Sequence, residues 1–417
     1  MNPNPTKRFF CRAIFLALGL LPLLGTFSWA AYRGLYQTNT SYARLVGDRL
    51  GMECKIGNVV HVRPGTIRFE GVRLQDAEDL TIVVECGAVV VQSSDFEREV
   101  RIPALSVADG KFRRLLKSLD ERVLQNPRTL DLPTVVQIDQ LAIHSNGSAA
   151  STLKNIRLEA SLTDVGPQAN VEFALLTPQN KSGGETNERI RMDVIREMTR
   201  PDSSESAPVT RLNLLTGKAK LPCSLLAGFF GSHHLNPEAT FRGNIHLDSD
   251  SRVNAAWTGD VSGHLENLRL EEICSLATGT AKLTFRKATF EKGSATLLDG
   301  TLAVNGGTLN SEFVSSAVEN LGMTVGEGHQ DFLADPSGLV PFDFINVDFV
   351  IENGESTLKG IVPSGSPGDL AIVNGKSLFS QPPSKVRNVD LLRTLLGLSP
   401  EQVPVANDSA LLRAFPQ

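Results

Sequence analysis

The sequence predicts a mostly β protein with a few short helices, in which an N-terminal transmembrane helix precedes an elongated, curved antiparallel β-sheet or groove built from short strand repeats. Three observations predict this: an uncharged segment near the N-terminus, many short alternating runs separated by turn residues, and one strand pattern that occurs three times. Short strands without long helices between them argue against folds that alternate strands and helices.

The composition limits the class of protein. A chain of 417 residues with 41% hydrophobic and 21% charged residues has enough apolar side chains to form a large folded core. A net charge of −5 argues against a nucleic-acid partner, so none is expected. Aromatic residues make up only 6%, which disfavours sites that stack sugars or bases on aromatic rings.

Residues 1–32 are expected to be a cytoplasmic tip followed by a membrane anchor. Lys7, Arg8 and Arg12 precede an uncharged run of nineteen residues from Ala13 to Ala31. At 1.5 Å per helical residue this run covers roughly 28 Å, about the hydrocarbon thickness of a bilayer. The basic flank predicts a single-pass inner-membrane protein with its N-terminus in the cytoplasm and its bulk in the periplasm.

A removable signal peptide is the alternative for the same segment. Ser28-Trp29-Ala30 has the small-x-small pattern of a cleavage site. The run is long for the apolar core of a signal peptide, which favours a retained anchor. Either interpretation exports the rest of the chain.

The segment around which the sequence is interpreted is Thr66–Gln75, with the sequence TIRFEGVRLQ. Its apolar residues alternate, with a slip of one position at Gly71; they are Ile67, Phe69, Val72 and Leu74. Alternation is the period of a strand with one buried face, and a slip sends later side chains to the other face unless the chain bulges. Gly71 can adopt the positive φ that such a bulge often needs.

The same order of residues returns twice, at Leu153–Glu159 and Leu265–Glu271. Both copies have Asn in place of Gly, and Asn is the next most tolerant residue at positive φ. A looser fourth copy, Phe344–Phe349, is compatible with chance. The three copies are either similar edges of amphipathic strands or a repeated β unit, and a repeated unit predicts an elongated stack.

The remainder divides into regions by pattern. Residues 33–180 are expected to form an N-terminal β region with one helix near 111–124, and residues 209–400 a C-terminal β-repeat region. Between them, the polar segment 181–208 is predicted to be a linker or long loop holding a short helix at Arg189–Met198. Residues 401–417 are expected to be an irregular tail. Further short helices are predicted at Thr40–Leu50, Leu221–Phe230, Ser311–Leu321 and Val389–Leu398.

Catalytic and metal-binding patterns are absent from the sequence, so no catalytic residue, metal or cofactor is expected. The only adjacent histidines, His233 and His234, project apart in regular structure. Outside the N-terminal segment the chain has four cysteines and no CxxC pattern; they are Cys54, Cys86, Cys223 and Cys274. They are either two disulfides, with Cys54–Cys86 and Cys223–Cys274 as the local pairing, or four buried thiols.

The N-terminal half resembles the AsmA-like family of inner-membrane-anchored periplasmic proteins of envelope biogenesis. The resemblance rests on the anchor, the helix after it, and the run LGMECKIGNVVHVRPGTIRFEGVRLQDAEDLTIVVECGAVVV, with a glycine after the helix at Gly51. Gly263–Glu271 and Phe342–Lys359 are similar to the strand repeats of the family's C-terminal half. Together these pieces cover about half of the chain.

The resemblance implies a non-enzymatic role in lipid handling, lipid transport or outer-envelope assembly, performed by an apolar β-groove. The implied partners are the membrane, phospholipid acyl chains and other envelope proteins. Candidate floor residues of the groove are Ile67, Phe69, Val72, Leu74, Leu153, Leu158, Leu265 and Leu270. The alternatives are an exported β-sandwich scaffold or binding module, in which the same side chains form a sealed core, and an exported enzyme.

Overall fold

The computed structural model describes most of the chain after the predicted anchor. The described residues are 38–108, 110–126, 130–145, 148–175, 189–198, 208–230, 236, 238–250, 257–330, 338–361, 366–399 and 401. The predicted membrane span at Ala13–Ala31, the histidine pair His233-His234 and nearly all of the predicted tail lie outside these residues. No helix among the described residues is long and apolar enough to cross a membrane.

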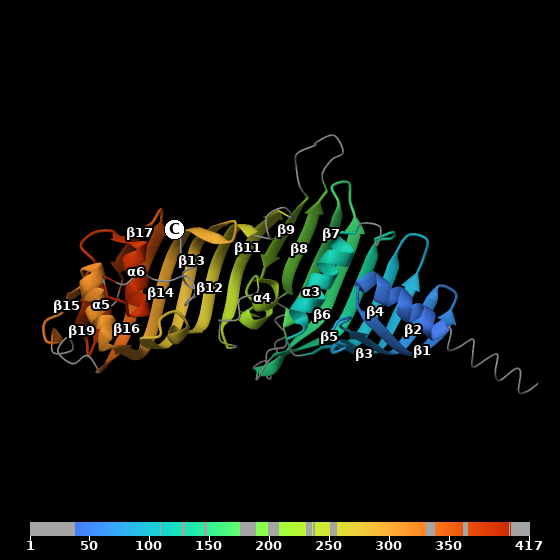
Figure 1. The fold of residues 1–417 in the computed structure, drawn as a ribbon, viewed down its shortest axis with the longest axis horizontal. Helices are drawn as coiled ribbons and strands as arrows, with labels where there is room; N and C mark the ends of the chain where they lie inside the picture. Colours follow the sequence, from blue (N-terminus) through green and yellow to red (C-terminus); the bar gives the residue numbers. More distant parts are fainter. Residues whose placement is uncertain are drawn as a thin grey trace, which may run out of the picture.

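The described chain forms one long, curved, mixed sheet of 20 strands that carries a few short helices (Figure 1). Its strands are β1 (Glu53–Arg63), β2 (Thr66–Gln75), β3 (Ile82–Ser93), β4 (Arg98–Val107), β5 (Thr134–Ser145), β6 (Ser148–Leu162), β7 (Pro167–Leu175), β8 (Arg189–Glu197), β9 (Val209–Leu215), β10 (Leu221–Pro222), β11 (Thr240–Asp250), β12 (Trp257–Arg269), β13 (Ala277–Glu291), β14 (Ser294–Asn310), β15 (Thr324–Val325), β16 (Leu339–Glu352), β17 (Glu355–Gly360), β18 (Asp369–Val373), β19 (Lys376–Ser380) and β20 (Val386–Arg387). The expectation of a mostly β, elongated chain is confirmed.

Most neighbouring strands are also neighbours in the sequence. Fifteen strands follow one another across the sheet: β1–β9, β11–β14, β16 and β17. At a spacing of about 4.8 Å, their fourteen intervals span roughly 67 Å. The described molecule is elongated along this direction (Figure 1).

The prediction of a wholly antiparallel sheet is wrong at one place. β4 and β5 are parallel, with Arg98 opposite Thr134 and Val107 opposite Ile143. Parallel neighbours need a crossover connection, and the chain supplies it with the helix between these two strands. The helix that the sequence predicts near 111–124 is therefore the element that carries the chain back along the sheet, so that β5 runs in the same direction as β4.

The slip residues of the three-fold pattern adopt the expected backbone. Gly71, Asn155 and Asn267 have φ values of 62°, 50° and 58°. Register shifts accompany Asn155 in the pairing of β6 with β7 and Asn267 in the pairing of β12 with β13. At Gly71 no register is lost, because glycines lie at the same level in β1 and β3, namely Gly57 and Gly87. Asn346 of the looser copy is not among the positive-φ residues.

Five helices lie on one face of the sheet (Figure 1). They are residues 38–50, α3 (Phe112–Leu119, continued by the π-helical turn Asp120–Leu124), α4 (Cys223–Phe230), α5 (Ser311–Leu321) and α6 (Asn388–Leu396). All five were predicted within a few residues. We call the face that carries them the inner face and the opposite face the outer face.

The predicted helix within the polar segment 181–208 is wrong, because residues 189–197 form strand β8. β8 pairs with β7 on one side and β9 on the other, so the sheet continues across the segment expected to be a linker. Ile190, Met192 and Val194 alternate with polar residues and contribute to the apolar cluster of the inner face. Period-two alternation specifies a strand even in a strongly charged segment.

All four described cysteines are free and buried. Cys54 and Cys86 lie on β1 and β3 with β2 between them, which separates their backbones by about two strand spacings, or roughly 9.6 Å. A disulfide needs Cα atoms closer than about 7 Å, so this pair cannot form without backbone movement. Burial raises the pKa of the Cys54, Cys86 and Cys274 thiols to about 11.

Candidate functional site

The inner face is the extended apolar surface of this fold and therefore the candidate functional site. Residues directly opposite each other on neighbouring strands share a face, and so do residues two apart along a strand. Phe69 lies opposite Val59 of β1 and Val89 of β3, and all three belong to one apolar cluster. This cluster extends from β1 to β12, and a second one continues from β12 to α6.

All eight sequence-predicted floor residues belong to the inner side of the sheet: seven lie on strands, where the positive-φ residue at each slip returns the next apolar side chains to the same face, and Leu270 begins the 3-10 turn after β12. Five of them are buried: Phe69, Val72, Leu74, Leu153 and Leu270. The other three are half-buried: Ile67, Leu158 and Leu265. Burial differs among them because the helices cover some parts of the inner face and leave others uncovered.

The N-terminal part of the inner face is covered by helix 38–50. The Tyr42 ring packs edge-on against the Phe69 ring, with 5.4 Å between their centroids. The side-chain amide of Asn39 donates to the Gly57 carbonyl oxygen at 3.1 Å, which fixes the start of the helix over β1. Phe69 is therefore a core residue beneath a helix.

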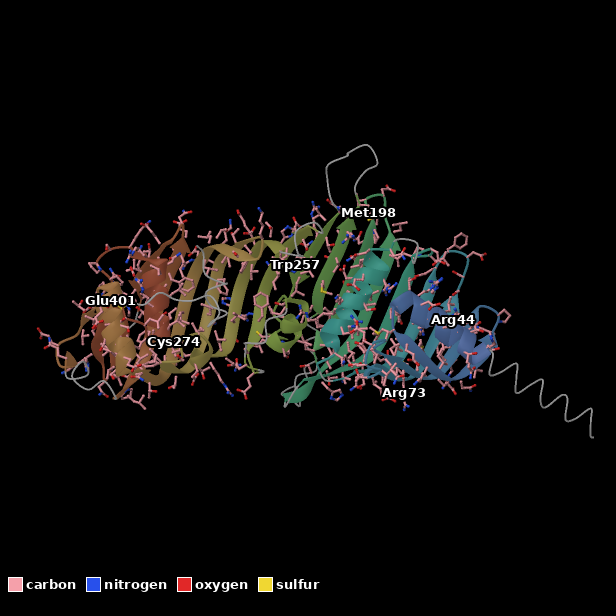
Figure 2. All side chains as sticks on the ribbon, viewed as in Figure 1. Arg44, Arg73, Met198, Trp257, Cys274 and Glu401 are labelled. Carbon is pink, nitrogen blue, oxygen red and sulfur yellow. The ribbon has the colours of Figure 1, made fainter. Side chains whose placement is uncertain are left out.

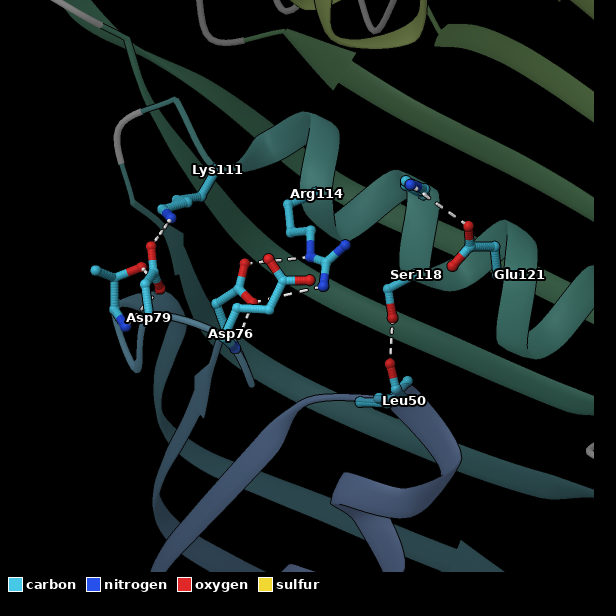
Figure 3. Close-up of polar contacts among 10 residues, drawn as sticks. Leu50, Asp76, Asp79, Lys111, Arg114, Ser118 and Glu121 are labelled. Atoms are coloured by element: carbon cyan, nitrogen blue, oxygen red, sulfur yellow. Dashed lines mark hydrogen bonds and ion pairs between the residues drawn. The ribbon is translucent and has the colours of Figure 1, made fainter. Parts of the chain in front are cut away.

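Polar contacts hold α3 beside that helix (Figure 3). Arg114 pairs with Asp76 at 3.2 Å, and Lys111 pairs with Asp79 at 3.0 Å. Hydrogen bonds from Thr81, together with the bond from Lys111, lower the pKa of Asp79. The Ser118 hydroxyl donates to the Leu50 carbonyl oxygen at the end of helix 38–50. These contacts tie the crossover helix to the loop after β2 and to the first helix.

Two helices cover the C-terminal end. α5 and α6 pack on each other, and the Thr394 hydroxyl of α6 donates to the Ser316 carbonyl oxygen of α5 at 3.3 Å. Val314 of α5 is completely buried, and Phe313 packs edge-on against Phe379 of β19. This end of the inner face is a sealed core.

Between α4 and α6 no described α-helix lies over strands β12 and β13, which are joined by the 3-10 turn Leu270–Glu272 (Figure 1). The larger side chains of this central part include six apolar residues that are half-buried: Val261, Leu265, Leu283, Phe285, Leu298 and Leu302. Smaller neighbours such as Ala281 and Ala288 are buried between them. Register places Leu283 between Leu265 of β12 and Leu302 of β14. Only Leu265 was nominated from the sequence, although the alternation in β13 and β14 carries the same signal.

The outer face is charged and hydrated. Ion pairs recur along it, including Arg286–Asp348 at 2.6 Å between strands and Lys220–Glu266 at 2.6 Å between the loop before β10 and β12. Hydrogen bonding from Lys220 lowers the pKa of Glu266, and hydrogen bonds to Asp299 and Asp348 raise the pKa of Arg286. A shallow depression of about 270 Å³ on this face is lined by Arg157, Glu159, Asn170, Glu172, Arg189 and Arg191.

Neither face shows a constellation with an obvious chemical role. Within the described ranges, no three His, Cys, Asp or Glu side chains converge as metal ligands would. The displaced pKa values of Glu266 and Arg286 are explained by their ion pairs and hydrogen bonds, and those of the cysteines by burial. The arrangement is suited to binding apolar material on one face while the other face remains in water.

Comparison with known proteins finds no relative of this chain. No protein family, no curated protein and no solved structure matches the chain significantly. What defines the chain is thus a class of architecture: a long curved sheet with one apolar face, partly covered by short helices.

Proposed function

We propose that this protein is a membrane-anchored periplasmic protein that binds lipid acyl chains on the inner face of its sheet, in lipid transport or in assembly of the outer envelope. In this proposal residues 1–32 hold the chain in the inner membrane as a single span, with the N-terminus in the cytoplasm. The role is binding and shielding, without catalysis. The resemblance to the AsmA-like family supports this proposal.

The observation that carries the proposal is the uncovered central part of the inner face. Six large apolar side chains on β12, β13 and β14 are half-buried, whereas the described helices seal the two ends of the sheet. Each buried methylene of a bound chain is worth about 0.8 kcal/mol, so an acyl chain lying across several strands gains substantial free energy. The polar outer face keeps the complex in water.

A second candidate function is an exported scaffold or binding module that carries no lipid. The sealed ends favour it, since Phe69 beneath Tyr42 and Val314 within α5 are ordinary core residues. The two candidate functions predict opposite occupancies for the central part of the inner face. A scaffold keeps that part free of lipid, whereas a lipid-binding protein carries acyl chains there.

The test is native mass spectrometry of the full-length protein extracted in mild detergent, with identification of the lipids that co-purify. The informative variant is Leu283→Asp, because this side chain lies in the middle of the uncovered part. The matched control is Thr280→Asp, an exposed residue three positions away on the same strand. Stoichiometric phospholipid that is lost in Leu283→Asp and kept in the control supports the proposal. If the folded wild-type protein carries no bound lipid, the lipid-binding proposal is refuted and the scaffold function is favoured.

A further inference from the structure

One basic side chain is buried within the apolar inner face. Arg196, near the end of β8, is 7% exposed, and no other lysine or arginine of the described chain is buried to this degree. An arginine stays protonated at every physiological pH, so burial cannot remove its charge. A buried charge is costly unless an opposite charge or several hydrogen bonds compensate it.

The described residues supply one hydrogen-bond partner, and no nitrogen of Arg196 is both buried and without a partner. The guanidinium donates from Nη1 to the Thr210 hydroxyl at 2.8 Å, and no carboxylate in the described ranges lies within ion-pair distance of it. The acidic side chains nearest along these strands, Glu197 and Asp248, belong to the outer face, where both pair with Arg211. Alternation thus places the carboxylates on one face and leaves Arg196 on the other.

Register builds a polar row around this arginine. Arg196 lies opposite Thr210 of β9, Thr210 opposite Ser249 of β11, and Ser249 opposite Trp257 of β12. Thr210 and Ser249 are also buried. Met198, which follows β8, and Trp257 both lie toward the upper long edge of the sheet in Figure 2. The row therefore lies along one rim of the inner face.

Apolar residues border the row on its inward side. The next inner-face positions are Val194, Leu212 and Leu247, all members of the apolar cluster. The row ends at Trp257, and the inner face of β12 continues from there through Val261 and Leu265 into the uncovered central part. A rim that carries one arginine and two hydroxyl groups, beside an apolar floor, matches a ligand with an anionic head and an apolar tail.

We propose that Arg196, Thr210 and Ser249 form a binding site for a phosphate anion, with the phosphate of a phospholipid headgroup as its source. The planar guanidinium presents paired N–H donors that suit phosphate oxygens. The Thr210 hydroxyl accepts from Arg196, which leaves its own O–H to donate to the anion. That the phosphate belongs to a lipid rests on the proposed function, whereas the phosphate site itself rests on the buried Arg196 and the two hydroxyl groups beside it.

Titration of the full-length protein in a non-ionic detergent tests the site. The probes are dihexanoyl phosphatidic acid, dihexanoylglycerol without phosphate, and inorganic phosphate, read by native mass spectrometry and by Trp257 fluorescence in a Trp29→Phe background. We expect Arg196→Met to bind phosphatidic acid about ten- to a hundredfold more weakly and to bind dihexanoylglycerol unchanged. Arg196→Lys should restore part of the preference, because it retains the charge.

A thermal melt without ligand separates a binding role from a structural one. Replacing a buried, poorly compensated charge by an apolar side chain of similar length should leave the melting temperature unchanged or raise it. Should Arg196→Met fail to fold, Thr210→Val and Ser249→Ala test the same site. An equal preference for phosphatidic acid in wild type and folded variants overturns the site.

The three probes also distinguish failure of the phosphate site from failure of the proposed lipid-binding function. Inorganic phosphate binding that depends on Arg196, with neither lipid bound, keeps the phosphate site and refutes lipid binding. Both lipids bound equally, with no dependence on Arg196, keeps lipid binding and refutes the phosphate site. Binding of none of the three probes refutes both.

Discussion

Removing the Phe69 side chain should release helix 38–50 from the sheet. Phe69 is 8% exposed and contacts the Tyr42 ring edge-on at 5.4 Å. A buried Phe→Ala substitution costs about 3–5 kcal/mol, and an aromatic pair of this geometry contributes about 0.5–1.5 kcal/mol beyond its buried area. Phe69→Ala should therefore lower the local free energy of opening by several kcal/mol.

Hydrogen exchange measured by mass spectrometry is the appropriate assay, because a chain of this size need not unfold in a single step. Since about 1.4 kcal/mol corresponds to a tenfold change, amides of helix 38–50 and β2 should exchange at least about a hundredfold faster. Tyr42→Ala combined with Phe69→Ala completes a double-mutant cycle, in which the coupling energy reports the ring contact.

The control for this experiment is Val62→Ala, because Val62 lies on β1 with 58% of its surface exposed. Exposed substitutions of this kind change stability by about 0.5 kcal/mol or less. If Phe69→Ala behaved like this control, or if the two aromatic substitutions were strictly additive, the helix would not pack on Phe69. The N-terminal floor would then be open and would join the candidate lipid-binding surface.

Two further predictions concern the bulges and the thiols. Asn267 has a φ of 58°, so Asn267→Gly should shift the melting temperature little, whereas the β-branched Asn267→Val should destabilise the protein by about 1–2 kcal/mol or more; equal melting temperatures would show that the bulge is not required. The Cys54 and Cys86 thiols have a pKa of about 11 in the folded chain against an ordinary 9.0, so their contribution to stability is complete below pH 9 and is lost as pH rises towards 11. Melts between pH 8 and 11 should show this loss, and the Cys54→Ala/Cys86→Ala variant should show a smaller one; an identical decline in both would contradict the assignment.

The candidate phosphate site illustrates what sequence patterns miss. Arg196 lies in a segment that composition marks as polar, and a single arginine there gives no signal of burial. Its environment arises from pairing with β9, which begins beyond a segment of chain that carries no apolar pattern. Register between strands is a property of the whole sheet, so the row from Arg196 to Trp257 could not be inferred locally.

The central part of the inner face, over which no described α-helix lies, shows a second feature that sequence patterns do not predict. Leu265 and Leu270 belong to one copy of the repeat, before and after its slip, yet Leu270 is 5% exposed in the 3-10 turn after β12 and Leu265 is half-buried on the strand. Both were predicted to face inward because alternation fixes the face of a side chain. What covers that face is decided by the placement of the helices, and the sequence carries no comparable pattern for it.

The sequence by itself determined the strand class, the five short helices and the three positive-φ slip positions, because period, propensity and tolerance of positive φ are local properties of the chain. Only the tertiary structure decided that β4 and β5 run parallel, that residues 189–197 continue the sheet, and that the helices seal both ends of the inner face and leave its centre uncovered. These features depend on contacts between residues distant in sequence, whose free energy no single segment encodes.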